Sequence, residues 1–597
     1  MMFHSALSRY IIFVVGISLA VSSAYETAEK KRLPVLGFNT WNQFACNISE
    51  TLIKELADSV VDLGLDKIGY NYINIDDCWQ ASTRDSNGKI QSDPIRFPSG
   101  MKALGEYIHS KGLKFGIYSS AGFKTCEAFP ASLGMEYNDV MSYVEFEVDY
   151  LKYDNCYTDK APPNKRYKIM GEAIDKSGRD IYYNLCEWGV ENPAAWAGEV
   201  ANSWRISPDI RDGWSSILSR AAISAPLWRY ASVDYGWNDP DMLEVGNGGC
   251  SDEEYRTHFA LWAMLKAPLI LGNDLRSLEI GDSIYDIISN KDIIAINQDS
   301  LGWQARRIWS DSLRNVDRDE GHSPDLTTRL IATKCASKDA AASSTPLHQD
   351  DPMDQQWQFT DDGKLFSVST GMCLVEDSVD ASTGLENSPE VENYDEYLGM
   401  DAPYFNNRLR RSVRLGSCDG ESATTWTLGT GSYGGQIQSK VSGNCLEVLT
   451  SNKDRFLATG KKVLTRKCET GSLREHQSFV MPYGINGTVV NLYQQSCITI
   501  DRDAPPGVLE AWVTPLANYD VAVLFVNKDP LPRKISVPYS SINEGLKGLD
   551  ESIYLQSDET YMMKELWSGK VIKQGVAESI DQIVPEHGSK LLVVTNN

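Results

Sequence analysis

Two periodicities of apolar residues alternate along the chain from Leu33 to about residue 300. Short apolar runs, typical of buried strands, are followed by stretches in which apolar residues recur every three or four positions. The stretch at 50–64 shows the second pattern, because Leu52, Leu56 and Val60 fall on one side of a helix. The alternation therefore predicts strands separated by helices.

Eight apolar runs in this part of the chain are strand candidates. Further helices are expected around 101–112 and at 253–267. Strands that alternate with helices form parallel sheets, and eight such units predict a (β/α)8 barrel. The strand candidates are VLGFNTWN (35–42), YNYINIDDCW (70–79), KFGIYSSAG (114–122), VDYLKYDNC (148–156), DIYYNLCEWG (180–189), SWRISPDI (203–210), LWRYASVDYGWNDPDM (227–242) and APLILGND (267–274).

The fourth strand candidate carries the residues around which the prediction of function is built. Period-two alternation places Tyr150, Lys152 and Asp154 on one face, and Leu151 and Tyr153 on the other. Lys152 and Asp154 are therefore expected in one cavity, where the lysine would keep the carboxylate ionised, as a nucleophile must be. The alternative from this stretch alone is a buried structural ion pair.

Polar, aromatic or acidic residues stand at the ends of nearly all these strands. The carboxyl ends of barrel strands meet at one face, where active sites of such barrels lie. Unrelated helix caps and turns explain one or two such clusters, but not seven. The clusters are Trp41; Asp76 and Asp77; Tyr118; Lys152 and Asp154; Glu187; Arg205 and Asp209; and Asp239 and Asp241.

Composition fits a soluble globular protein and argues against a nucleic-acid partner. The 597 residues are 42% hydrophobic and 23% charged, and the formal net charge is -24. Basic residues do not cluster over any long stretch, as a phosphate-binding surface requires. Nor is there an apolar run long enough to cross a membrane.

The N-terminus predicts export from the cell. Arg9, a short apolar run and small residues at its end form a signal peptide, assigned to residues 1–24. Residues 25–32 end in a basic cluster that is either a processing site or a solvated charge cluster. The mature protein is expected to be secreted, with N-glycosylation at Asn47 and Asn486.

The twelve cysteines are interpreted as disulfide-forming, because the number is even and the compartment oxidising. Cysteines that follow neighbouring barrel strands lie on neighbouring loops at one end. This arrangement leaves Cys186 and Cys250 without an assigned partner in the barrel. It predicts the pairs Cys46–Cys78 and Cys126–Cys156.

The chemistry expected of this face is that of carboxylates. The chain has seven histidines and no His/Cys ligand spacing, so no metal is expected. No phosphate-binding or dinucleotide-binding glycine pattern follows the first strand, so no cofactor is expected either. One ionised carboxylate, one protonated carboxyl group and polar groups that hold hydroxyls are what glycoside hydrolysis requires.

A family resemblance covers about Leu33 to Trp309 and returns near the C-terminus. This part of the chain resembles glycoside hydrolase family 27, the melibiase-type α-galactosidases, in its motifs and in their order. The resemblance implies a (β/α)8 barrel followed by an antiparallel β-sandwich, and a secreted enzyme that removes terminal α-galactosyl residues from oligosaccharides, galactomannans or glycoconjugates. The motifs are GFNTWNQFACN, NIDDCWQ, GIYSSAG, YLKYDNC, CEWG, WRISPDI, WNDPDML, HFALWAMLKAPLILGNDL and INQD.

The resemblance also implies two catalytic roles. Asp154 is the nucleophile and Asp209 the general acid and base of a retaining mechanism, in which the two carboxyl groups lie about 5–5.5 Å apart. Asp209 then needs a raised pKa from an apolar or like-charge environment, while Lys152 keeps Asp154 charged. Asp212 is either a supporting carboxylate or, as we favour, a residue at a helix N-terminus.

A galactose-binding shell follows from the same resemblance, with Asp241 in a structural role that holds a loop. Its members are Asp76 and Asp77 at O4 and O6, Lys152 at O3 and O4, Glu187 and Arg205 around O2, Trp41 against the apolar face of the sugar, and Tyr118, Cys156 and Met242 along the pocket wall.

Glu187 decides which sugar is expected. In related α-N-acetylgalactosaminidases a small residue stands at this position and leaves room for a 2-acetamido group, so a glutamate indicates galactose. An α-N-acetylgalactosaminidase or a β-L-arabinopyranosidase is the alternative enzyme. A lectin with an inactive barrel is the alternative from another class, and the presence of both Asp154 and Asp209 argues against it.

The second half departs from the family pattern. The barrel is assigned to 33–298 and the sandwich to 299–312 and 507–597, with 313–506 inserted between the two parts of the sandwich. The sandwich strands are predicted in LEAWVTPLANYDVAVLFVNKD, KISVPYSSI, YMMKELWSGK and GSKLLVVTN.

Three units of the insert, at 355–357, 424–426 and 477–479, resemble the Q-x-W repeat of ricin-type β-trefoil lectins. The insert either binds carbohydrate or, as we favour, has a structural role. A trefoil inserted into a hairpin needs adjacent termini. The expected disulfides are Cys373–Cys418, Cys445–Cys468 and Cys335–Cys497.

Overall fold

The computed structural model describes residues 32–190, 193–311, 508–547 and 553–596, together with short segments between 329 and 501. The predicted signal peptide, 1–24, lies outside these residues. Within the part described, no helix is long and apolar enough to cross a membrane.

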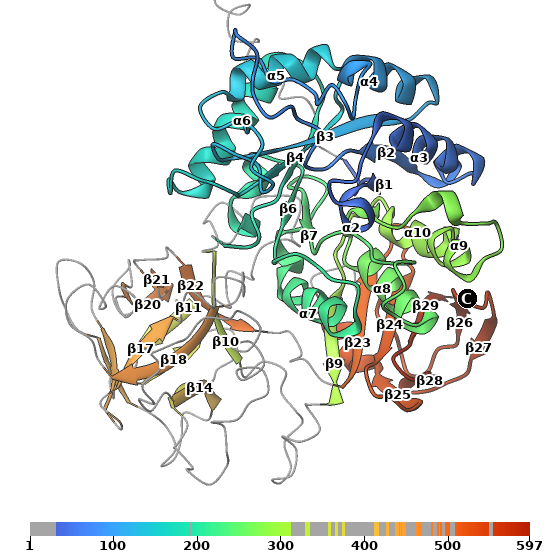
Figure 1. The fold of residues 1–597 in the computed structure, drawn as a ribbon. Helices are drawn as coiled ribbons and strands as arrows, with labels where there is room; N and C mark the ends of the chain where they lie inside the picture. The colour runs from blue at the N-terminus through green and yellow to red at the C-terminus, as the bar shows by residue number, and fades with distance from the viewer. Residues whose placement is uncertain are drawn as a thin grey trace, which may run out of the picture.

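Eight parallel strands form one curled sheet, in which each strand from β2 to β7 pairs with the one before it and β8 pairs with β1 (Figure 1). The two remaining edges meet after β7, where Leu243 forms a parallel bridge with Leu271 and its N–H donates to the Ile270 carbonyl at 2.8 Å. The predicted barrel is thus confirmed. Its strands are β1 (Leu36–Asn39), β2 (Tyr70–Asn74), β3 (Lys114–Ser120), β4 (Tyr150–Asp154), β5 (Tyr182–Leu185), β6 (Ser203–Arg205), β7 (Trp237–Asp239) and β8 (Leu269–Leu271).

Helices connect the strands, and local sequence sets several of their starts. The Ser49 hydroxyl accepts from the Leu52 N–H at the start of α3, and Ser251 with Glu254 forms a capping box at α8. The helices of this part are α2 (Trp41–Phe44), α3 (Glu50–Asp62), α4 (Gly100–Ser110), α5 (Glu136–Glu145), α6 (Pro163–Ser177), α7 (Trp214–Ser224), α8 (Asp252–Met264), α9 (Ser283–Ile288) and α10 (Lys291–Asn297), with the short 3-10 turns η1 (Asp66–Ile68), η2 (Pro193–Ala195), η3 (Ala197–Glu199), η4 (Ala225–Tyr230) and η5 (Leu275–Ser277).

The strand predicted at 227–242 is mostly wrong. Residues Ala225–Tyr230 form the 3-10 helix η4, and only Trp237–Asp239 forms the strand β7. Pro226 lies in the first turn of η4, where its missing N–H would have no partner in the helix anyway. The apolar residues that alternate in the first part of this segment therefore belong to a short helix and not to a strand.

The predicted alternation in β4 is confirmed. Tyr150 lies in a cluster inside the barrel with Tyr72 and Tyr182, and its ring stacks on that of Tyr182 at 5.2 Å between centroids. Leu151 and Tyr153 belong to the large core formed with the surrounding helices. The register therefore directs Lys152 and Asp154 to the inner face, above the tyrosines and at the carboxyl end of the barrel.

The loops after β3 and β4 touch at Gly122. The Phe123 N–H donates to the Tyr157 carbonyl at 3.0 Å, and a Cβ placed on Gly122 would lie 1.8 Å from the Cys156 carbonyl oxygen. We expect Gly122→Ala to lower the free energy of unfolding by about 1–3 kcal/mol, because the loop that carries Cys156 must move. Denaturant unfolding measures the change.

Gly575→Ala is the matched control for this prediction. A Cβ on Gly575 has no neighbour within 4 Å, so its effect should stay within about 0.5 kcal/mol. Equal effects of the two substitutions would contradict the steric argument.

The C-terminal region forms antiparallel sheets with a core of their own (Figure 1). A six-stranded sheet has the order β27-β26-β29-β24-β23-β9, and β25 pairs with β28. The elements are β9 (Arg306–Ser310), β23 (Leu509–Pro515), β24 (Val521–Asn527), β25 (Arg533–Pro538), α12 (Tyr539–Gly545), β26 (Tyr561–Glu565), β27 (Val571–Gln574), β28 (Ser579–Val584) and β29 (Ser589–Asn596).

Between β9 and β23 the chain makes a long excursion and returns to the same sheet. β9 and β23 are antiparallel neighbours, with Trp309 opposite Ala511. Within this excursion its first strand, β10 (Arg329–Lys334), pairs with its last strand, β22 (Ser496–Asp501), along six residues. The beginning and the end of the inserted segment therefore lie side by side.

The described strands of the insert are antiparallel, and Trp357 and Trp426 from the repeat units are buried. Cys445 is disulfide-bonded, whereas Cys335, Cys418 and Cys468 lie outside the described residues, and with them the three predicted disulfides of the insert. The remaining strands are β11 (Gln356–Phe359), β12 (Leu365–Ser367), β13 (Cys373–Glu376), β14 (Arg411–Gly416), β15 (Trp426–Leu428), β16 (Ile437–Ser439), β17 (Asn444–Val448), β18 (Lys461–Lys467), β19 (Phe479–Val480), β20 (Asn486–Thr488) and β21 (Val490–Asn491).

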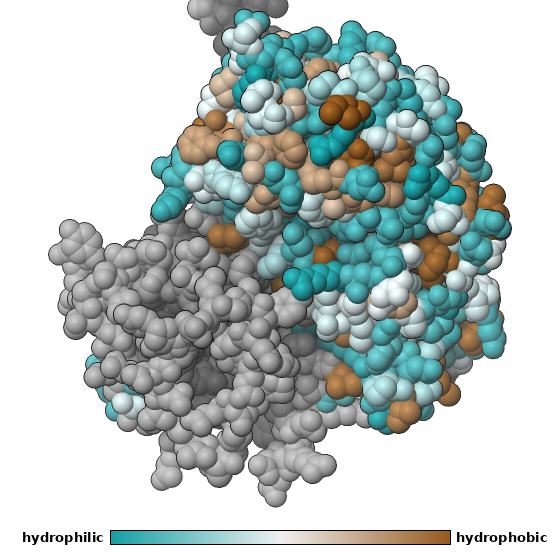
Figure 2. Space-filling model, in the orientation of Figure 1, coloured by the Kyte–Doolittle hydropathy of each residue, from teal (hydrophilic) through white to brown (hydrophobic). Residues whose placement is uncertain are grey.

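The described surface is largely polar in the view of Figure 2, and the apolar residues on it are scattered in small groups. Asn47, the first predicted glycosylation site, is exposed just after α2. Asn486, the second, is the first residue of β20.

Candidate active site

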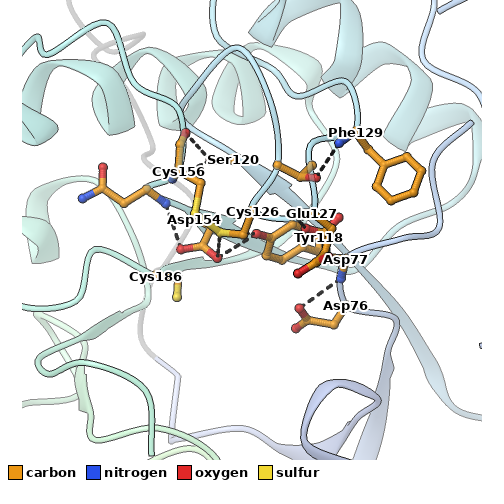
Figure 3. Close-up of a disulfide and its surroundings, with 12 residues drawn as sticks. Asp76, Asp77, Tyr118, Ser120, Cys126, Glu127, Phe129, Asp154, Cys156 and Cys186 are labelled. Atoms are coloured by element: carbon orange, nitrogen blue, oxygen red, sulfur yellow. Dashed lines mark hydrogen bonds between the residues drawn. A yellow bond between two sulfur atoms is a disulfide. The ribbon is translucent and has the colours of Figure 1, made fainter. Parts of the chain in front are cut away.

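Asp154 ends β4 and is held in place through both of its oxygens. Tyr118, on the neighbouring strand β3, donates its hydroxyl to Oδ2 at 2.7 Å, and the Asn155 N–H donates to Oδ1 at 2.8 Å (Figure 3). The Cys126 sulfur lies 3.2 Å from Oδ2. Two hydrogen bonds and the neighbouring Cys126 sulfur therefore fix the position of this buried carboxylate.

Both disulfides predicted for the barrel are present. Cys46–Cys78 joins the loops that follow β1 and β2, and Cys126–Cys156 joins those that follow β3 and β4. The second lies directly against Asp154 (Figure 3). Its sulfurs thereby lie beside the predicted nucleophile, while the contact of Cys156 with the sugar stays a prediction.

The two remaining barrel cysteines, Cys186 and Cys250, are free thiols. Cys186 is buried directly after β5, and its sulfur lies 3.5 Å from a guanidinium nitrogen of Arg205. In Figure 3 it lies below Asp154, so it belongs to the floor of the same site. No motif in the sequence indicates this position for Cys186.

Asp76 and Asp77 follow β2 and are both buried, but they have different partners. Asp76 accepts at Oδ2 from the ammonium of Lys152 and from the amide of Asn39, each at 2.8 Å. Asp77 accepts from the backbone N–H groups of Cys78 at 2.7 Å and of Glu127 at 2.9 Å. Burial raises the pKa of Asp77 to about 6.

The expected action of Lys152 on Asp154 needs correction. The direct partner of Lys152 is Asp76, and burial raises the pKa of Asp154 above its ordinary value although Lys152 and the Tyr118 hydroxyl work to lower it. The alternative of a buried ion pair thus applies to Lys152 and Asp76. Lys152 still lowers the pKa of Asp154, but this effect is smaller than the rise that burial causes.

The expected environment of Asp209 also needs correction. Arg205, buried at the end of β6, places a guanidinium nitrogen 2.9 Å from Oδ1 of Asp209, whose side chain is 68% exposed. Burial works to raise the pKa of Asp209, but the positive charges of Arg205 and Lys152 lower it below its ordinary value. These contacts therefore favour the ionised form of Asp209, not the protonated one.

Asp241 positions this part of the site, as expected. The same guanidinium nitrogen of Arg205 lies 2.8 Å from Oδ2 of Asp241, which also accepts from the Ile210 N–H at 2.8 Å. Asp241 thereby ties β6, the loop with Asp209 and the end of β7 together. Burial raises its pKa to about 6.

Asp212 stands directly before the N-cap residue of α7, at the helix N-terminus, which is the favoured of its two predicted positions. The helix α7 has Gly213 as its N-cap residue and makes no side-chain cap bond. Asp212 accepts instead from the Tyr255 hydroxyl and from the Gly249 N–H, so it anchors the loop before α8.

The other predicted residues also lie at the carboxyl ends of the strands. Glu187 is fully buried two residues after β5, and Met242 is buried three residues after β7. Trp41 begins α2 two residues after the end of β1, is partly buried, and donates its backbone N–H to the side-chain Oδ1 of Asn39 at 2.9 Å. Asn39, which binds both Trp41 and Asp76, was missed, although it lies within the strand predicted at 35–42 and is the last residue of β1.

One cluster of possible metal ligands lies at this site. Among the described residues, the one group of possible ligands close enough together is Cys126, Asp154 and Cys156. Both cysteines are joined in a disulfide, so neither offers a thiolate. The donor set left is a single carboxylate.

Comparison with known proteins decides the family. The Alpha galactosidase A family model matches residues 33–299, and the model of the alpha galactosidase C-terminal beta sandwich domain matches 506–594. Alpha-galactosidase 2 of Arabidopsis thaliana is 51% identical over 307 residues, which cover 50% of this chain and 77% of the relative. The chain belongs to the melibiase-type alpha-galactosidases.

Solved structures agree with this family. Alpha-galactosidase I from Mortierella vinacea superposes with a TM-score of 0.57 at 26% identity, over 96% of this alpha-galactosidase and 99% of that chain. The alpha-galactosidase from Saccharomyces cerevisiae with raffinose gives 0.56 at 23% identity over 95% and 98%, a likeness that bears on the fold. As an alpha-galactosidase the protein is a glycoside hydrolase, which removes the alternative of a lectin with an inactive barrel.

Proposed function

We propose that this alpha-galactosidase is a secreted, retaining exo-enzyme that releases terminal non-reducing α-D-galactosyl residues from galacto-oligosaccharides, galactomannans or glycoconjugates. One observation carries the proposal. A buried carboxylate, Asp154, is fixed by Tyr118 and a backbone N–H at the end of β4, while the more exposed Asp209 interacts with it electrostatically from the loop after β6.

The first chemical step forms a covalent galactosyl-enzyme. An Asp154 oxygen attacks the anomeric carbon as Asp209 gives its proton to the glycosidic oxygen, and the aglycone leaves as a neutral alcohol. In the second step Asp209 takes a proton from water, whose oxygen attacks the same carbon and releases Asp154. Two inversions retain the α configuration of galactose.

Substrate binding would favour the protonated form of Asp209 that the first step needs. The side chain of Asp209 is 68% exposed, and a bound sugar ring would cover it. Loss of solvent disfavours the carboxylate form and raises its pKa. Arg205 retains Asp241 as a buried partner at 2.8 Å when its contact with Asp209 weakens.

The galactose ring is held in this proposal by groups that are already ordered. Asp76 and Lys152 form a buried ion pair whose remaining hydrogen-bonding positions serve O3, O4 and O6, together with Asp77. Glu187 and Arg205 serve O2, and the indole of Trp41 lies against the apolar face of the sugar.

Glu187 sets the choice between galactose and its 2-acetamido analogue. The residue is fully buried, so its volume is not available to an acetamido group. This supports α-galactosidase activity over the alternative α-N-acetylgalactosaminidase.

The test is hydrolysis of p-nitrophenyl α-D-galactopyranoside, of its 2-acetamido analogue and of p-nitrophenyl β-L-arabinopyranoside. We expect rapid cleavage of the first alone, with α-galactose as the first product in the NMR spectrum. Initial β-galactose would refute retention, and preference for either other substrate would refute the specificity given to the pocket.

Secretion is part of the proposal. Its support is the N-terminal apolar segment, with Arg9 before it, and the two disulfides of the barrel, which are typical of oxidising compartments.

We also propose that residues 313–506 form a ricin-type β-trefoil-like module. The antiparallel strands, the paired ends of the segment at β10 and β22, and the burial of Trp357 and Trp426 support this fold.

A further inference from the structure

The short helix α2 carries Trp41, the residue assigned to the apolar face of the sugar, but has little support of its own. It spans four residues, its N-cap residue Thr40 makes no side-chain cap bond, and none of its residues is buried. A single helical turn is not stable by itself, because few of its backbone groups find partners within the helix. The orientation of Trp41 therefore depends on contacts with other parts of the barrel.

Glu244, in the loop after β7, binds α2 at the residue next to Trp41. Its Oε1 accepts from the amide nitrogen of Asn42 at 2.8 Å, and its Oε2 accepts from the amide nitrogen of Asn247 at 2.5 Å. Both carboxylate oxygens are thereby engaged, one of them with α2. Asn39 binds the same helix from the end of β1, through the backbone N–H of Trp41.

The backbone of Glu244 is anchored to the barrel core. Its N–H donates to Nε2 of His258 in α8 at 3.0 Å, and the ring of His258 packs edge-on against Trp262, with 4.1 Å between the centroids. Trp262 in turn donates its indole N–H to the Asp241 carbonyl at 2.6 Å. Both aromatic residues of α8 are fully buried, so Glu244 extends from a closely packed part of the molecule.

A glutamate is a costly residue at this position. Glu244 is 4% exposed, and the charged groups that act on it most, Asp241 and Asp212, are acidic. Burial raises its pKa to about 7, while the hydrogen bonds from Asn247 and Asn42 work to lower it. A buried carboxylate without a cation is tolerated when its oxygens accept hydrogen bonds, and the two amide groups supply them. The cost thus indicates that the bond to α2 has a use.

The same contact lies next to another residue of the predicted galactose shell. A Cβ placed on Gly272 would lie 2.9 Å from the side chain of Met242 and 3.2 Å from Cβ of Asn42, so both pack closely against the end of β8. Asn42 therefore has little space on that side, and its bond to Glu244 fixes the remaining freedom of α2.

We propose that Glu244 is a positioning residue for galactose binding, which holds Trp41 against the sugar through Asn42. The inference rests on the proposed function, because that function assigns Trp41 to the galactose face. Glu244 itself does not touch the sugar. The predicted catalytic carboxylates are held by other groups, Asp154 by Tyr118 and Asp209 by Arg205, so loss of Glu244 affects binding more than turnover.

The test measures the inhibition constant of galactose and kcat with p-nitrophenyl α-D-galactopyranoside. Glu244→Leu and Asn42→Ala each remove the bond to α2, and we expect each to raise the inhibition constant about tenfold. Glu244→Gln keeps one acceptor and adds a donor, which Asn42 can accept after its amide turns over, so its effect should stay within about threefold. In all three variants kcat should change less than about threefold.

A second comparison asks whether Glu244 acts through Trp41. Trp41→Ala removes the indole and should itself raise the inhibition constant of galactose. In that background Glu244→Leu should add nothing, whereas independent effects would multiply. The control is Glu510→Gln, which alters a buried carboxylate of β23 that accepts from Lys528. It should lower the free energy of unfolding without changing the inhibition constant.

The outcomes separate this inference from the proposed function. Folded Glu244→Leu and Asn42→Ala proteins that bind galactose as wild type does would overturn the positioning role, as would multiplying effects in the Trp41→Ala background. If Glu244→Leu does not fold, Asn42→Ala, at a half-buried residue, decides the question alone. Unchanged inhibition in Trp41→Ala would instead overturn the place given to Trp41 in the proposed function. Wild-type protein that does not cleave the aryl galactoside would overturn that function as a whole.

Discussion

Replacing Asp154 by asparagine is expected to lower kcat by about 10⁴-fold or more while galactose still binds. Removal of a nucleophile on which all turnover depends has effects of this size or larger. Asparagine has the same shape, and its carbonyl oxygen can still accept from the Tyr118 hydroxyl, which is 2.7 Å from the carboxylate. Steady-state kinetics and calorimetric titration with galactose measure the two quantities.

Asp154→Gly gives a chemical check of the same role. The cavity left by the carboxylate admits azide, which can attack the anomeric carbon once and yield β-galactosyl azide from an activated aryl α-galactoside. Wild-type protein should not form this product. Substantial turnover by Asp154→Asn, or α-galactosyl azide from the glycine variant, would refute the assignment of the nucleophile.

Replacing Asp209 by asparagine should slow substrates according to their leaving groups. General acid catalysis contributes about 10²–10⁴-fold, and an alkyl or sugar aglycone needs this proton most. Raffinose cleavage should therefore fall by such a factor, whereas formation of the galactosyl-enzyme from 2,4-dinitrophenyl α-galactoside, whose leaving group needs no proton, should fall far less. Equal losses for both substrates would contradict the role of proton donor.

The pH profile of Asp209→Asn carries a second signature. Wild-type kcat/KM should be bell-shaped, because catalysis needs Asp154 ionised and Asp209 protonated. Without Asp209 only the ionisation of Asp154 remains, so activity on the dinitrophenyl substrate should rise with pH and level off. The Asp209 charge raises the pKa of Asp154, so its removal should also move the midpoint for Asp154 to lower pH.

The barrel could be predicted because each of its signals is local. Apolar runs bounded by polar residues mark buried parallel strands, and period two decides which face of β4 carries Lys152 and Asp154. Parallel order then brings the loops after successive strands together, which is why Cys126–Cys156 could be named. The error at η4 arose because Trp228 and Tyr230 alternate as they would in a strand, and only packing selects the helical turn.

The pairing of charges within the site could not be predicted. The sequence brings Lys152 near several carboxylates at one end of the barrel, but which of them lies at 2.8 Å depends on strand tilt and side-chain length. Likewise, the spacing of Arg205 and Asp209 does not show that Asp209 stays exposed while it shares one guanidinium nitrogen of Arg205 with the buried Asp241. Both corrections to the expected pKa values follow from these contacts.

The attachment of the insert makes the C-terminal sheet a natural docking point for other modules. β9 and β23 are adjacent antiparallel strands, so a turn of a few residues could join them directly. Because the entropy of closing a loop grows slowly with its length, the sheet tolerates either a short turn or a whole domain there. An inserted domain must have its two ends close together, as β10 and β22 are here. A different domain could thus be inserted at this position while the barrel strands and their carboxylates keep their sequence and connections.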